Sequence, residues 1–301
     1  MTSVNNFPVT VEQTNNQNDK LRNTAIGCAG AIAGYEADYY LKNGVMSSIR
    51  NKIKKEIIKV QTPDFKQYVN TAIKQNKLED GFKIIDLNPN TVEDVKKALK
   101  INLEPPTGIT KFFGHVLRLP LGKNVKSFNE TLKGQNAFFS PIDNAVVCNF
   151  DKFGAPLFHE VTHKLNDVSP NPIIKTLAKI RSPLAAFVPT MISMTAMLTD
   201  PKEKNGEDKK GFAGFVKKHC GILAAGAMLP LTIEECIANI KGTKVAEKAG
   251  VTGDLLKKVK HLHKMSIISY CSSLVATGLA VHFGNKLRDY ICSKRTDKAA
   301  A

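Results

Sequence analysis

The residues with the clearest capacity for chemistry are two histidines four positions apart, His159 and His163, with Glu160 directly after the first. On a helix, side chains four positions apart lie on one face, so both imidazoles can reach a single tetrahedral zinc ion. Glu160 then lies beside the metal, where it can take a proton from an activated water and pass it to a leaving amine. The pattern predicts His159 and His163 as metal ligands and Glu160 as a general base for peptide-bond hydrolysis. The alternative is a pair of surface histidines on an amphipathic helix.

A catalytic zinc ion needs a third protein ligand, because two histidines rarely hold one. Glu234 and Glu235 stand in the otherwise uncharged segment 231–239, where an acid is costly unless something pairs with it. Glu235 and Asn239 are four positions apart and share a helix face, so a ligand and a residue that orients the site can lie together there. This predicts Glu235 as the third ligand. Alternatively, both acids mark the point where the helix meets water.

The order of these motifs resembles the membrane metallopeptidase family that includes the CaaX prenyl endopeptidase and the bacterial heat-shock membrane protease. That family has Asn-Ala-Phe, a strand, HExxH, an apolar hairpin and then Glu-x-x-Ala-Asp. The resemblance covers about residues 136–239, and the matching segments here are Asn136-Ala137-Phe138, a predicted strand Ala145–Asn149, His159–His163, two apolar stretches and Glu235–Asn239.

The resemblance implies a zincin-like, gluzincin-type domain with His159, His163 and Glu235 as ligands. It also implies that an edge strand near Val146 and Val147 pairs with an extended substrate. Asn239 stands where the family has aspartate, so the group that would orient a ligand histidine is an amide. The family's later histidine, which stabilises the transition state, has no clear match, and either His261 or His263 is a candidate for that role.

The chain carries a formal net charge of +16, which suggests nucleic acid, an anionic membrane surface or acidic partners. Most of this charge is lysine, whereas arginine is scarce and tryptophan is absent. Nucleic-acid binding is therefore disfavoured, since arginine and aromatic residues provide base-edge recognition and base stacking. A lysine-rich surface facing a membrane is the favoured interpretation.

Three apolar stretches, at 183–199, 220–233 and 266–284, contain no Asp, Glu, Lys or Arg. Separated by lysine-rich loops, they are typical of a polytopic membrane protein, and the alternative is a set of buried helices in a soluble core. Segment 240–265 has seven lysines, and the loop 200–218 has six lysines diluted by acids. The positive-inside rule then predicts an inner-membrane protein with its active site facing the cytoplasm.

The sequence predicts a mainly α fold with a small β element (α+β), in which apolar helices are embedded in a membrane. Four parts are expected (1–20, 21–130, 131–265 and 266–301): a disordered tail, an N-terminal helical region that lies either on the protein core or on the membrane surface, the zincin-like domain that the resemblance implies, with the apolar hairpin, and an apolar helix with a basic tail. The segment 64–129 is expected to hold short helices broken by turns, one of them capped by Thr91 and reaching about Ile101.

The predicted function is that of a zinc-dependent endopeptidase, with Zn²⁺ as cofactor and a membrane-associated or misfolded protein as substrate. The alternative is a catalytically inactive, membrane-associated binding or scaffold protein. Neither interpretation identifies the substrate, because the sequence assigns no pocket-lining residues.

Overall fold

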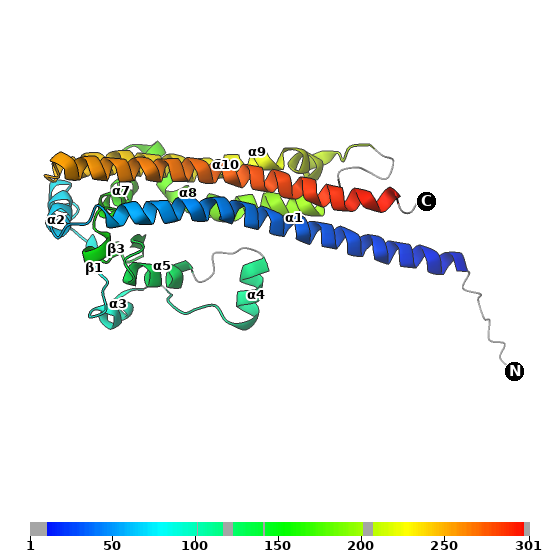
Figure 1. The fold of residues 1–301 in the computed structure, drawn as a ribbon, viewed down its shortest axis with the longest axis horizontal. Helices are drawn as coiled ribbons and strands as arrows, with labels where there is room; N and C mark the ends of the chain where they lie inside the picture. The colour runs from blue at the N-terminus through cyan, green and yellow to red at the C-terminus, as the bar shows by residue number, and fades with distance from the viewer. Residues whose placement is uncertain (1–10, 101, 117–122, 141, 201–206, 298–301) are drawn as a thin grey trace. The chain divides into compact units, whose positions relative to one another are not determined.

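The computed structural model describes residues 11–100, 102–116, 123–140, 142–200 and 207–297, and it is mainly helical with one small sheet (Figure 1). In chain order, the elements are α1 (Val11–Ile58), α2 (Phe65–Gln75), β1 (Lys83–Asp86), α3 (Val92–Ala98), α4 (Gly108–Val116), α5 (Lys123–Leu132), β2 (Phe138–Ser140), β3 (Ala145–Cys148), α6 (Phe150–Phe153), α7 (Leu157–Asp167), α8 (Pro172–Leu198), α9 (Gly211–Lys248) and α10 (Gly253–Asp297). The predicted fold class is confirmed.

The sheet has three strands in the order β1-β3-β2, with β1 parallel and β2 antiparallel to β3. Ile84 of β1 and Phe139 of β2 both pair with Val146 of β3. The strand predicted at Ala145–Asn149 is therefore present as β3. The four residues of β1 fall in the segment where only helices were expected, since a run of four is too short to show a strand period.

The prediction that Val146 and Val147 lie on an edge strand is wrong. β3 is the middle strand, and its two neighbours take up the hydrogen-bonding groups of both its sides. The edges of this sheet belong to β1 and β2 instead. The cause is tertiary: β1, which is about sixty residues earlier in the chain, pairs with the side of β3 that was expected to be open.

Two hydrophobic clusters cover the two faces of β3, which explains why all four of its residues are apolar and buried. Val146 points into a cluster that also contains Phe65 of α2 and Phe158 of α7. Val147 points the opposite way, into a cluster with Leu87 and residues of α3 and α5. The two phenylalanine rings meet edge to face, with centroids 6.0 Å apart. This packing anchors α7, the helix that carries both histidines.

Several helices differ in extent from the sequence expectations. α1 begins at Val11, inside the expected polar tail, and runs without a break to Ile58; residues 1–10 lie outside the described residues. α3 begins after Thr91 as predicted but ends at Ala98. Ile101 lies outside the described residues.

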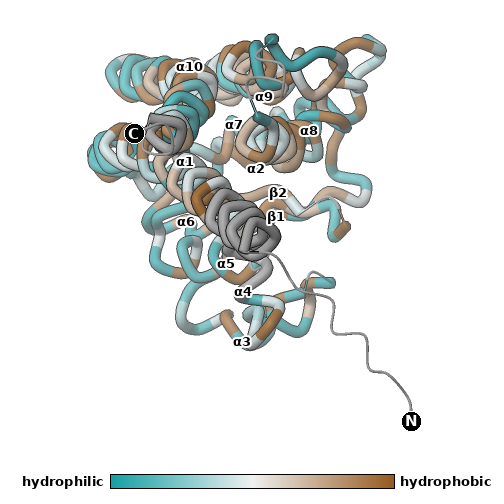
Figure 2. Tube along the Cα trace, turned by 90° about the vertical axis from the view of Figure 1, so that its right-hand side faces the viewer, coloured by the Kyte–Doolittle hydropathy of each residue, from teal (hydrophilic) through white to brown (hydrophobic). Residues whose placement is uncertain are grey.

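The three apolar stretches lie in α8, α9 and α10, and hydrophobic segments of α8 and α9 appear in brown in Figure 2. By length and composition, α9 and α10 are each able to cross a membrane, and they are the two such helices among the described residues. Core helices of soluble proteins meet the same criterion, so this is weak evidence of membrane association.

By internal contacts the chain forms two compact units. One comprises Met1–Lys42, Met191–Ala224 and Thr277–Ala301, and the other comprises Asn43–Thr190 and Ala225–Ala276. The sheet, α2 and α7 belong to the second unit, as does the part of α9 that contains Glu235. The four-part division expected from the sequence stays a prediction.

Within the first unit, small residues allow helices to approach closely. A Cβ atom added to Gly34 of α1 would lie 2.5 Å from the carbonyl oxygen of Gly284 in α10. Nearby, Lys217 is buried and donates hydrogen bonds to Asn285 and Asp289, both at 2.8 Å. The glycine- and alanine-rich segment 24–34 of α1 therefore allows close helix packing.

Gly242 sets how closely α9 approaches the helix with the histidines. A Cβ atom at this position would lie 3.1 Å from the carbonyl oxygen of Phe158 and 3.2 Å from the Cα of His159. Backbone atoms cannot move aside as a flexible side chain can. We expect Gly242→Ala to lower the thermal unfolding midpoint, because the added methyl group pushes α9 away from α7.

Gly226 is the matched control, because it lies in the same helix and an added Cβ would meet nothing within 4 Å. Alanine is the better helix former by about 1 kcal/mol, so Gly226→Ala should raise the same midpoint. An equal rise for both variants, measured by thermal unfolding, would contradict the close approach at Gly242.

Candidate metal centre

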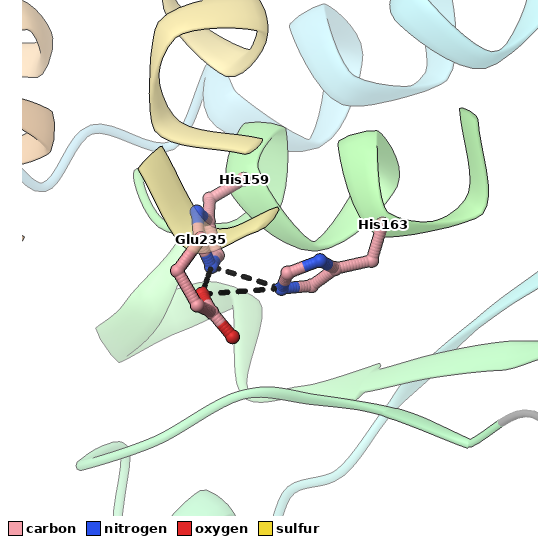
Figure 3. Close-up of side chains that lie close together, drawn as sticks. All are labelled: His159, His163 and Glu235. Atoms are coloured by element: carbon pink, nitrogen blue, oxygen red, sulfur yellow. Dashed lines mark hydrogen bonds and ion pairs between the residues drawn. The ribbon is translucent and has the colours of Figure 1, made fainter. Parts of the chain in front are cut away.

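Three buried side chains from two helices converge on one point (Figure 3). His159 and His163 are one helical turn apart on α7, and Glu235 comes from α9. Pro156 lies at the N-terminal cap of α7, which begins at Leu157, so the HExxH motif is helical as predicted. The sequence therefore identified the three residues that the structure brings together as a group able to hold a metal ion.

The spacing of the three nearest atoms fits a tetrahedral ion. The Nε2 atoms of the two imidazoles are 3.0 Å apart, and Glu235 Oε2 is 3.0 Å from His159 Nε2 and 3.6 Å from His163 Nε2. Ligand atoms about 2.0–2.1 Å from a tetrahedral zinc ion are about 3.3 Å from one another. The observed separations bracket that value, so these residues fit zinc without rearrangement of the helices.

Two imidazole nitrogens that face each other at 3.0 Å need a proton or a metal ion between them. Neutral imidazole has one bare nitrogen, and two bare lone pairs at this distance repel each other. A shared proton or a metal ion removes the repulsion, and the Glu235 carboxylate favours either one. The arrangement therefore suits either a shared proton or a metal ion, and the three residues form a group that could hold a metal ion.

The electrostatics around His159 and Glu160 agree with this. Burial lowers the pKa of His159, but the hydrogen bond and charge of Glu235 outweigh burial, so its pKa is raised above the ordinary value. Burial raises the pKa of the Glu160 carboxyl, against the opposing charges of His163 and His159. A carboxylate whose affinity for protons is increased in this way is better suited to act as a general base.

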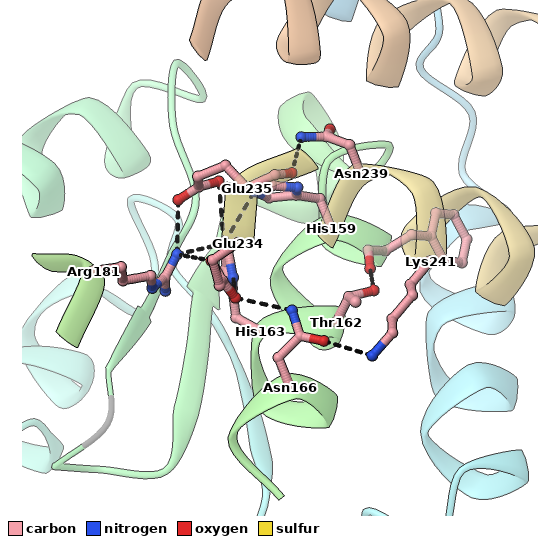
Figure 4. Close-up of polar contacts among 10 residues, drawn as sticks. His159, Thr162, His163, Asn166, Arg181, Glu234, Glu235, Asn239 and Lys241 are labelled. Atoms are coloured by element: carbon pink, nitrogen blue, oxygen red, sulfur yellow. Dashed lines mark hydrogen bonds and ion pairs between the residues drawn. The ribbon is translucent and has the colours of Figure 1, made fainter. Parts of the chain in front are cut away.

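Glu234, the neighbour of the predicted ligand, orients His163. Its Oε1 atom lies 3.0 Å from His163 Nδ1, on the far side of the ring from the facing Nε2 atoms (Figure 4). The same oxygen accepts a hydrogen bond of 2.9 Å from Asn166 Nδ2, and Asn166 Oδ1 accepts one of 2.8 Å from Lys241. A carboxylate behind a ligand imidazole fixes its tautomer and direction, so Glu234 supplies the orienting group that was expected from position 239.

Arg181, on α8, joins the two acids. Its Nη1 atom donates to Glu234 Oε2 at 2.5 Å and to Glu235 Oε1 at 2.7 Å. The same nitrogen is 3.4 Å from His163 Nε2. One guanidinium therefore contacts both buried carboxylates of the site.

The remaining predicted site residues lie around this group. Asn239 is buried and donates from Nδ2 to the Glu235 carbonyl oxygen at 2.7 Å; its contact with a ligand histidine stays a prediction. His263 is buried with its ring centroid 6.5 Å from that of His159, and its Nδ1 lies 2.8 Å from Thr243 Oγ1. His261 is exposed. The structure thus places His263 nearer to the candidate centre, and its catalytic role remains untested.

Sequence reasoning missed Arg181, Asn166 and the orienting role of Glu234. Arg181 lies two positions before the uncharged stretch that begins at residue 183, and Asn166 is three positions after His163 on the same helix. For Arg181, the available signal was that it is a lone arginine at the border of an apolar stretch. Asn166 gave no signal in the sequence, because a polar residue at the end of a short helix is common.

Comparison of the chain with protein-family models, with curated proteins and with solved structures found no match. The resemblance to the membrane metallopeptidases therefore rests on the motifs and on the geometry of the triad. What the fold and the site define is a mainly helical protein with a buried His-His-Glu group that can hold a metal ion.

Removal of both imidazoles should abolish metal binding. We expect the purified protein to hold one zinc ion per chain and His159→Ala/His163→Ala to hold none, as measured by elemental analysis after dialysis. The control is His261→Ala, which changes an exposed histidine outside the triad and should leave the zinc content unchanged. Equal zinc in the wild type and the double variant would exclude this centre.

Loss of the orienting carboxylate should weaken zinc binding without removing a ligand. We expect Glu234→Gln to raise the zinc dissociation constant about 10- to 100-fold, because His163 loses the charged partner that fixes its ring. The measurement is competition with a chelator of known affinity. Glu247→Gln, an exposed change on the same helix, should bind zinc like the wild type. Unchanged affinity in Glu234→Gln would contradict the orienting role.

Proposed function

We propose that this protein is a zinc-dependent endopeptidase. The observation that carries the proposal is the convergence of His159, His163 and Glu235, with Glu160 on the same helix turn as the first histidine. Two imidazole nitrogens and one carboxylate oxygen are the protein ligands of a catalytic zinc site with one position left for water or substrate. When bound, zinc would polarise the scissile carbonyl and lower the pKa of a water molecule.

The protein's own residues supply the proton transfers and the orientation. Glu160 would accept a proton from the attacking water and later donate it to the leaving amine nitrogen. The raised pKa of its carboxyl supports the first step, because a stronger base accepts the proton more readily. Glu234 would keep the His163 ring in the tautomer that leaves Nε2 free for the metal.

An extended substrate segment would pair with the free edge of β2, Phe138–Ser140, in place of the β3 edge expected from the sequence. Two observations support this: β2 is an edge strand, and it packs against α7. Backbone hydrogen bonds at such an edge bind a peptide with little dependence on its sequence. This mode suits an enzyme that acts on membrane-associated or misfolded proteins.

Association with a membrane is supported by the apolar surface of the long helices. Exposed apolar residues recur at steps of seven and four along α9 and α10: Ile222, Leu229, Ile233 and Ile240 on α9, and Ile268, Val275 and Leu279 on α10. Only 39% and 33% of the two candidate spanning windows are buried inside the protein. A lipid phase would cover the remainder, and the lysine-rich segment 240–265 favours a cytoplasmic active site.

The alternative function is a catalytically inactive binding or scaffold protein. The main motivation for this inactive alternative is Asn239, an amide at the position where the peptidases that the motifs resemble have an aspartate. The carboxylate of Glu234 behind His163 weakens that motivation, since the site has a charged orienting group from another position. The endopeptidase is therefore the better-supported function.

The decisive substitution is Glu160→Gln, which keeps the size of the side chain and removes its basicity. We expect the rate of peptide hydrolysis to fall about 10²- to 10⁴-fold, because general acid–base catalysis is lost. Zinc content and thermal unfolding should stay at wild-type values, because Glu160 is not a ligand. The measurement is cleavage of a fluorescently quenched unfolded protein by the purified chain in detergent.

Glu247→Gln serves as the matched control, because it makes the same chemical change at an exposed position. It should cleave at the wild-type rate. Absence of cleavage by zinc-loaded wild-type protein would favour the scaffold alternative. Equal cleavage by wild type and Glu160→Gln would contradict the assigned role of Glu160.

A further inference from the structure

We propose that the guanidinium of Arg181 is a permanent positive charge in the candidate metal centre and that it positions Glu234 and Glu235. Its guanidinium would neutralise Glu234 and Glu235 while no metal is bound, and it would hold Glu235 so that one oxygen alone faces the metal position. The second part of this inference, the positioning of Glu235, rests on the proposed metal site. The neutralising role concerns the metal-free protein.

Glu234 and Glu235 are adjacent acids whose side chains are 0% and 7% exposed. Two carboxylates removed from water at this proximity are unfavourable unless a positive charge lies beside them. Arg181 Nη1 contacts both, at 2.5 Å and 2.7 Å, and its own side chain is 15% exposed. Low exposure means that water screens these ion pairs little, so the removal of one partner costs more stability than it would in a surface pair.

Within the described part of the chain, Arg181 is the only lysine or arginine that forms an ion pair with either acid. The nearby Lys241 directs its ammonium to Asn166 Oδ1 instead. The remaining partners of the two carboxylates are His159 and His163, whose positive charge depends on a proton. Arg181 therefore supplies the one permanent positive charge on these acids.

The two oxygens of Glu235 have separate partners. Oε1 accepts the hydrogen bond from Arg181, and Oε2 faces the Nε2 atoms of both histidines. A metal ion at the triad would use Oε2, so it would join Arg181 at this carboxylate rather than replace it. The bond to Arg181 keeps Oε1 occupied and favours coordination through one oxygen, which leaves room for a further ligand.

Arg181 lies on α8, the helix between the two ligand helices in the sequence. After His163 on α7, the chain continues into α8, which carries Arg181, and then into α9, which carries Glu235. The segment between the two ligand helices thus contributes the arginine that forms ion pairs with Glu234 and Glu235.

The test compares thermal unfolding of the purified full chain in its metal-free and zinc-loaded forms. For Arg181→Gln we expect a decrease of roughly 5–10 °C in the metal-free midpoint, because two buried carboxylates lose their cation. The zinc-loaded midpoint should decrease less, since the ion supplies positive charge to the same acids. Zinc should therefore raise the midpoint more in Arg181→Gln than in the wild type.

Three further variants separate charge from packing. Arg181→Lys keeps the positive charge and should unfold nearer to the wild type than Arg181→Gln does. Arg181→Gln/Glu234→Gln removes one unpaired carboxylate and should regain part of the lost metal-free midpoint, also if Arg181→Gln alone fails to fold. Lys179→Gln, an exposed change on the same helix, should behave as the wild type.

Equal decreases in the metal-free and zinc-loaded forms of Arg181→Gln would overturn the proposal, as would a lysine variant as unstable as the glutamine variant. Failure of the double variant to recover would overturn it too. A wild-type chain that binds no zinc would contradict the proposed enzyme, whereas the metal-free comparisons would still decide whether Arg181 neutralises the two acids.

Discussion

The buried negative charge of Glu234 and Glu235 is the constraint on which the rest of this site depends. Carboxylates in a largely apolar helix are retained only where cations or hydrogen-bond donors surround them. Here the surrounding groups come from two other helices: α7 provides the imidazoles of His159 and His163 and the amide of Asn166, and α8 provides the guanidinium of Arg181. Their requirement for positive charge favours a cation beside His159, His163 and Glu235, the group that could hold a metal ion.

The sheet and its two hydrophobic clusters give this centre a rigid support. β3 is buried on both faces, and the cluster on one face includes Phe158, which directly precedes the ligand His159. At Gly242, α9 lies so close to the backbone of α7 that a single added methyl group would force the two helices to shift. A ligand set drawn from two helices keeps its geometry only if the helices are held this tightly.

The site also shows how one orienting group can stand in for another. The peptidases that the sequence motifs resemble have an aspartate four residues after a glutamate ligand, and this chain has Asn239 there, with its amide donating to the carbonyl oxygen of Glu235. Glu234 provides a carboxylate from the residue immediately before the ligand, and it reaches His163. The chemical requirement, a charged acceptor behind a ligand imidazole, is met by a different position.

The sequence by itself determined the local parts of this protein: the helical HExxH motif, the strand at Ala145–Cys148, the apolar helices and the choice of Glu235 as a partner for the histidines. The helix, the strand and the apolar segments follow from spacing and polarity within a few residues, whereas Glu235 was predicted because it is an acid in an otherwise uncharged segment and because the order of the motifs resembles that of the membrane metallopeptidases. Only the tertiary structure decided that β3 lies in the middle of the sheet, that Glu234 orients His163 and that Arg181 contacts both acids. Each of these depends on segments 50 or more residues apart, and no local pattern specifies which distant side chain will lie against a given buried charge.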